Sequence, residues 1–208
     1  MSDFFLQKAY EYYPRNLNFL NNSREIDQAY FETKEYKYLN EHLDRFCLDE
    51  NHFLKSSSKG ILDILQGKLE LRDVSRPCQD DRAICLQHSG FYEEKTKKFR
   101  PLCFAISALI PYFHAYMMEI DLIEDNYNKP FKYQWKSISG PLTCWKEKSL
   151  YNDTYSLVCD TIIQFTDYKE FPEELVNKKI PDISKNNIEF GEVTFFNAFF
   201  LDRYYCYP

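Results

Sequence analysis

The sequence predicts an α+β fold, in which N-terminal helices precede a mainly antiparallel or mixed β-sheet with one or two further short helices. Three observations support this class. Residues 24–53 contain no Gly or Pro and repeat apolar side chains at three- and four-residue steps, the spacing of an amphipathic helix. Residues 131–136 alternate aromatic and polar side chains, which is the period of a strand. Residues 101–109 and 112–123 are apolar runs separated by Pro111, as expected of buried strands.

We expect a single domain over residues 1–208, with a helical part at 1–67 and a strand-rich part at 68–208. The helical part begins with a short helix that Ser2 or Asp3 can cap and that Pro14 ends. A long helix over 24–53 follows.

The serine run 56–58 is expected to interrupt the helical part. Ser58 is a suitable cap for a last helix over 60–66, and Gly67 is a suitable stop.

The strand-rich part contains two segments whose secondary structure is less clear. Residues 82–88, 101–109, 112–123 and 131–136 are expected to be strands, although the period of 104–109 also permits a helix. Residues 153–167 fit a helix or a strand, and their β-branched side chains favour a strand. A short helix is expected at 171–176, because Pro172 and the acids after it suit a first turn. A final core strand is expected at 192–201.

Charge and cysteine usage limit the partners and the compartment. The chain of 208 residues carries 26 Lys and Arg against 32 Asp and Glu, a net charge of −6, and the acidity is concentrated in its second half. This balance disfavours nucleic acid and anionic membranes as partners and is compatible with a basic protein. Seven cysteines without a Cys-x-x-Cys pair, and no signal peptide, predict a cytoplasmic protein. The apolar stretch 102–118 is shorter than the roughly 20 residues that span a bilayer, so we expect a core segment.

No motif predicts an enzymatic reaction. The four histidines form no His-x-His or His-Glu-x-x-His pattern, and Cys85 with His88 lacks a second ligand pair for zinc. Five dispersed glycines form neither a P-loop nor a dinucleotide fingerprint. We therefore expect no metal and no cofactor. The alternatives are a hydrolase-like enzyme that uses His114 or Cys85 and His88, and a regulatory or structural subunit of a complex.

Two acidic clusters with neighbouring aromatic residues are the candidate partner-binding surface, because tyrosine is frequent at protein interfaces and acids can meet a basic partner. An ordinary solvated rim is the alternative. The first cluster comprises Glu119, Asp121, Glu124, Asp125 and Tyr127, and the second comprises Asp167, Tyr168, Glu170, Phe171, Glu173 and Glu174.

The chain resembles the bacterial immunity proteins that neutralise polymorphic or contact-delivered toxins. The resemblance lies in its small size, its acidity, its many Phe and Tyr residues and its lack of catalytic motifs, together with the segment 190–202 (FGEVTFFNAFFLD). It covers the whole chain in composition and assigns no individual residues. It implies a non-enzymatic protein that covers the active site of a toxin stoichiometrically, with its acids in place of an anionic substrate.

Overall fold

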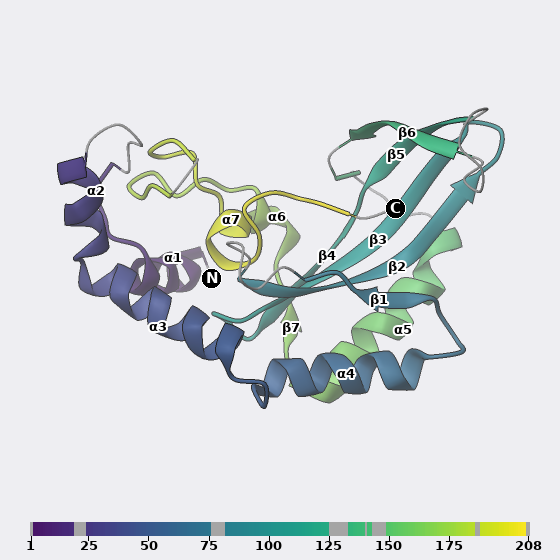
Figure 1. Ribbon diagram of the computed structural model, residues 1–208, viewed down its shortest axis with the longest axis horizontal. Helices are drawn as coiled ribbons and strands as arrows, with labels where there is room; N and C mark the ends of the chain where they lie inside the picture. The colour runs from purple at the N-terminus through teal and green to yellow at the C-terminus, as the bar shows by residue number, and fades with distance from the viewer. Residues whose placement is uncertain are drawn as a thin grey trace.

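The computed structural model describes residues 2–18, 24–75, 82–124, 133–139, 141–142, 149–185 and 188–206. A β-sheet lies between helices on both of its faces, and the α+β class is confirmed (Figure 1). Among the residues described, no helix combines the length and the apolar character that crossing a membrane requires.

The described residues of the helical part form four helices, and the expected long helix over 24–53 is divided. The helices are α1 (Ser2–Tyr12), α2 (Arg24–Phe31), α3 (Lys34–Leu48) and α4 (Phe53–Leu65). Thr33 separates α2 from α3: its hydroxyl donates to the carbonyl of Tyr30 at 2.7 Å and accepts from the amide of Tyr36 at 3.3 Å. One threonine therefore terminates one helix and caps the next.

The prediction that residues 56–58 interrupt the helices is wrong, because α4 begins earlier and runs through them. His52 caps α4 by accepting from the amide of Leu54. Inside the helix, the Ser57 hydroxyl donates to the carbonyl of Phe165 and the Ser58 hydroxyl to the carboxylate of Asp73. Serine is unfavourable inside a helix when its hydroxyl forms hydrogen bonds with the nearby backbone. Here both hydroxyls instead donate to residues that are distant in the sequence.

The sheet is mixed and mostly antiparallel, with the order β1-β2-β3-β4-β7 and with β5 between β3 and β6. Only β4 and β7 pair in parallel among the described strands. The four predicted strand segments all contain strands, and the expected strand at 112–123 is divided at Met118. The bounds are β1 Leu71–Asp73, β2 Ala83–Glu93, β3 Lys98–Ser107, β4 Tyr112–Met117, β5 Glu119–Glu124, β6 Tyr133–Ser139 and β7 Lys169–Glu170.

Two segments expected to be strands are helices, α5 (Ser149–Thr166) and α7 (Phe195–Phe199). The apolar side of α5 buries Val158 and Ile162, four residues apart, in the core beneath the sheet. The short helix expected at 171–176 is confirmed as α6 (Glu173–Val176).

The two faces of the sheet carry separate cores. Alternate residues of β3 point to opposite faces. Cys103 and Ala105 pack with α1, α6 and α7, whereas Phe104 and Ile106 pack with α4 and α5. Figure 1 shows α4 and α5 along one face and α1, α6 and α7 at the other. The first core places α1 beside α3, and these two helices form the site described below.

Candidate functional site

Two members of the first predicted acidic cluster, Glu119 and Asp121, belong to an ion network within the sheet. Lys98 and the Nε of Arg100, both on β3, pair with the carboxylate of Glu119, at 2.9 Å for Arg100. Asp121 lies 3.9 Å from the ammonium of Lys98. Burial raises the pKa of Glu119, but the hydrogen bonds from Lys98 and Arg100 outweigh it and hold that pKa below its usual value.

The other three members of this cluster are Glu124, Asp125 and Tyr127. Glu124 is the last residue of β5, and its side chain, Asp125 and Tyr127 lie outside the described residues.

The second predicted cluster is mixed in exposure. Glu173 and Glu174 are exposed in the first turn of α6, and Asp167 is exposed after α5. Tyr168 and Phe171, by contrast, are buried in the core. The carboxylate of Glu170 accepts the hydroxyl of Tyr155. The exposed part of this cluster is therefore acidic without the aromatic residues that were expected beside it.

The structure does not bring the described members of the two clusters together. β5 pairs with the start of β3, at Lys98 and Phe99. β7 pairs with the start of β4, which lies beside the other end of β3, at Ile106. At about 3.3 Å per residue, the clusters lie roughly 25 Å apart along β3. Their described members, such as Glu119 and Glu173, therefore do not form one continuous surface.

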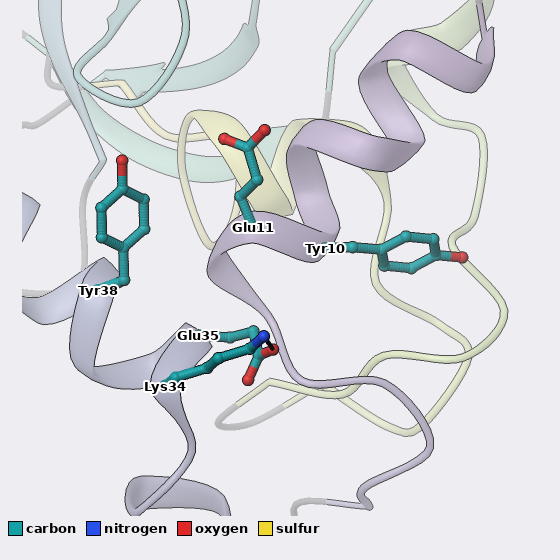
Figure 2. A pocket seen from close by; sticks show the side chains of 5 residues that line it. All are labelled: Tyr10, Glu11, Lys34, Glu35 and Tyr38. Atoms are coloured by element: carbon teal, nitrogen blue, oxygen red, sulfur yellow. Dashed lines mark ion pairs between the residues drawn. The ribbon is translucent and has the colours of Figure 1, made fainter.

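A hollow between α1 and α3 is a different concave site, with a volume of about 460 Å³. Tyr10 and Glu11 on α1 and Lys34, Glu35 and Tyr38 on α3 line it (Figure 2). Figure 2 shows Tyr38 and Glu11 on opposite sides of the opening, with the Lys34–Glu35 ion pair beside the chain that leaves α1. Because Thr33 caps α3, Lys34 and Glu35 fall in the first turn of that helix.

Tyr38 is an exposed aromatic ring on a fixed support. Its ring stacks on Tyr12, with centroids 5.5 Å apart and an interplanar angle of 14°, and meets His42 edge-on at 4.3 Å. Tyr12 is itself buried, and its hydroxyl donates to the carbonyl of Leu109 at 3.0 Å. Tyr38 nevertheless remains 43% exposed. The site thus presents an aromatic surface whose orientation is set by the core.

Tyr10 forms another part of the lining and shows how this region holds a cation. Its hydroxyl donates to Oδ1 of Asp182 at 2.7 Å, and Nε of Arg15 donates to Oδ2 of the same carboxylate at 2.7 Å. The guanidinium of Arg15 lies 4.4 Å from the centre of the Tyr10 ring. Burial and the hydrogen bond to Asp182 raise the pKa of Tyr10 to about 12, so the hydroxyl stays a donor.

The two carboxylates of the hollow are paired with lysines. Glu11 lies 2.9 Å from Lys8, one turn earlier on α1, and both side chains are well exposed. Glu35 is less exposed, at 23% of its side chain, and lies 3.8 Å from the ammonium of Lys34, whose side chain is 91% exposed. Glu35 therefore sits partly desolvated beside a loosely held cation.

The side chains of the enzymatic alternatives lie away from this hollow. His114 on β4 is 3% exposed and packs against the rings of Tyr116 and Phe196. Cys85 is buried on one face of β2, whereas the ring of His88 lies tilted against Phe91, which packs into the core of the other face. Within the described ranges, no three His, Cys, Asp or Glu residues are grouped as metal ligands.

Comparison of the chain with protein-family models, curated proteins and solved structures found no match. The hollow is therefore interpreted from its own geometry. Sequence reasoning missed its five residues, and one signal could have indicated them: Tyr38 lies off the apolar stripe of its helix, among charged neighbours.

Proposed function

We propose that this protein is a non-enzymatic, cytoplasmic binding protein that neutralises a basic protein toxin or effector by covering its active site stoichiometrically. The α1–α3 hollow is part of the surface that meets the partner. The observation that carries this proposal is Tyr38, a ring that is 43% exposed although it is stacked on the buried Tyr12.

Such a residue suits an interface for an energetic reason. Tyrosine contributes a large contact area and loses little side-chain entropy when it is bound. Because stacking on Tyr12 already restricts the Tyr38 ring, binding costs still less conformational freedom. Tyrosines in concave sites surrounded by polar groups are frequent among the residues that dominate binding energy. Glu11 and Glu35 line the hollow with Tyr38, and each is paired with an exposed lysine. A cationic group of a basic partner would compete with these lysines for the carboxylates, in agreement with the net charge of −6.

The proposal is tested by affinity capture of the tagged protein from a lysate of its native host, with mass spectrometry of the retained proteins. We expect one dominant basic, enzyme-like protein at near-equal stoichiometry. Tyr38→Ser should reduce its retention at least about fivefold. The purified partner should lose its activity when one equivalent of the wild-type protein is added.

Tyr92→Ser is the matched control, because Tyr92 is also 43% exposed but lies on β2, away from the hollow. An equal loss of retention in both variants would remove the hollow from the interface. The absence of any retained partner, in a host that expresses candidate toxins, would contradict neutralisation itself.

A further inference from the structure

We infer that the α1–α3 hollow is a subsite for the guanidinium of an arginine side chain of the partner, and that Lys34 is the internal cation that this arginine displaces from Glu35. The inference rests on the proposed function in taking the occupant to belong to a protein. It adds the chemical class of the group that is bound and the residue that competes with it.

The protein already binds one guanidinium in this way at the edge of the hollow. Arg15 lies over the ring of Tyr10 and donates to the carboxylate of Asp182, while the Tyr10 hydroxyl holds that carboxylate in place. A ring face together with a carboxylate is the arrangement that suits a planar, delocalised cation. The hydrogen bonds from Tyr10 and Arg15 outweigh the effect of burial and hold the pKa of Asp182 below its usual value.

The hollow contains the same two components for a second cation. Tyr38 supplies an exposed ring and Glu35 a carboxylate on the same helix, while Glu11, which is paired with Lys8, supplies a second carboxylate from α1. A volume of about 460 Å³ lies within the range of protein sites that take small ligands, so it has room for one side chain.

Lys34 is suited to be displaced. Its side chain is 91% exposed and its ammonium lies 3.8 Å from Glu35, at the outer limit of an ion pair. Exposed pairs of this kind contribute little, since holding a long lysine side chain costs entropy and water screens the charges. In general, an arginine side chain can stack on an aromatic ring as well as pair with a carboxylate. The interaction of Lys34 in this hollow is its ion pair with Glu35.

The test uses the full chain and a defined probe, acetyl-arginine amide, in an NMR titration that follows the ring signals of Tyr38. The neutral isostere acetyl-citrulline amide is titrated in parallel. We expect arginine to shift the Tyr38 signals and citrulline to bind at least about fivefold more weakly. Glu35→Gln should weaken arginine binding. Lys34→Met should strengthen it roughly twofold to fivefold, because it removes the internal competitor.

Lys37→Met is the matched control, since Lys37 is exposed on the same helix and does not line the hollow. It removes the same charge and should change the affinity for arginine less than Lys34→Met does. Equal effects of the two variants would assign the gain to overall charge and overturn the role of Lys34. Weaker arginine binding in Lys34→Met, equal binding of citrulline, or no arginine-dependent shift would overturn the subsite.

The outcomes separate this inference from the proposed function. If arginine fails to bind while capture of the partner still depends on Tyr38, the binding function stands and the arginine subsite does not. If arginine binds as expected and no partner is captured, the subsite stands and neutralisation does not.

Discussion

Gly60 lets helix α4 lie close to helix α5. A Cβ atom at this position would lie 2.3 Å from Cε1 and 2.9 Å from Cδ1 of Phe165, well inside van der Waals contact. In an exposed helix interior, replacing Gly by Ala stabilises the fold by about 1 kcal/mol. At Gly60 the ring of Phe165 blocks the added methyl group, so we expect replacement by Ala to destabilise the fold.

We predict that Gly60→Ala lowers the free energy of unfolding by about 1–3 kcal/mol, as overpacking of a core does. Urea denaturation followed by circular dichroism measures the change. The same substitution in a Phe165→Leu background should cost less, because the ring that it would meet is gone. A more stable Gly60→Ala variant in the wild-type background would contradict this contact between α4 and α5.

At the scale of the element, α7 depends on a capping box. The Thr194 hydroxyl accepts from the amide of Asn197, and the side-chain oxygen of Asn197 accepts from the amide of Thr194. With only Phe195–Phe199 in the helix, these bonds satisfy a large share of its terminal amides. They also fix a segment whose phenylalanines fill the core above the sheet.

We predict that Thr194→Ala lowers the free energy of unfolding by about 1 kcal/mol, the usual cost of losing an N-cap. Thr194→Ser keeps the hydroxyl and should retain most of the stability. Thermal and urea denaturation of the two variants, measured side by side, test the difference. If serine and alanine destabilise equally, the hydroxyl does not contribute through capping.

Individual helices and strands differ in how well the sequence predicts them. The presence of strands β2 and β3 was predictable from their apolar runs. Their bounds were not, because β2 continues through Gly90 to Glu93 and β3 begins at Lys98, before Pro101. Helix α5 was not predictable, because its β-branched residues favour a strand. The burial of Val158 and Ile162, which lie four residues apart, stabilises a helix instead. The hydroxyls of Thr161 and Thr166 donate to carbonyls four residues earlier, which accommodates both within the helix.

The candidate site was harder to predict than the fold. Acidic clusters can be read from neighbouring positions, such as Glu173 and Glu174. The hollow instead joins Tyr10 and Glu11 to Lys34 and Tyr38, which meet only because α1 and α3 pack together. The packing of two helices that are distant in the sequence is a tertiary property, and the short-range pattern does not contain it.

At the scale of the whole molecule, partly buried carboxylates couple stability to pH. The pKa values of Glu119 and Asp182 both lie below their usual values, through hydrogen bonds from Lys98, Arg100, Tyr10 and Arg15 that outweigh burial. Each group therefore contributes stability that is fully present above its unfolded-state pKa, about 4. That contribution is lost as the pH falls through the lower, folded-state pKa.

We predict that Glu119→Gln lowers the free energy of unfolding by about 1–3 kcal/mol at neutral pH, because Lys98 and Arg100 lose a shared charged acceptor. Its stability should also fall less steeply than that of the wild type below about pH 4. Urea denaturation across a series of pH values measures both effects. Glu94→Gln, in the exposed turn between β2 and β3, should leave the profile unchanged. Parallel profiles for Glu119→Gln and the wild type would contradict the linkage.

The contacts between the α1 region and the segment 195–198 have a consequence for folding during translation. The Tyr13 hydroxyl donates to the carbonyl of Ala198 at 2.8 Å, and Phe5 packs against Phe195. Tyr13 and Ala198 are 185 residues apart in the sequence. At about 5–20 residues per second, roughly 10–40 s of translation separate them. During that interval a nascent chain holds the apolar side of its first helix without its final partners.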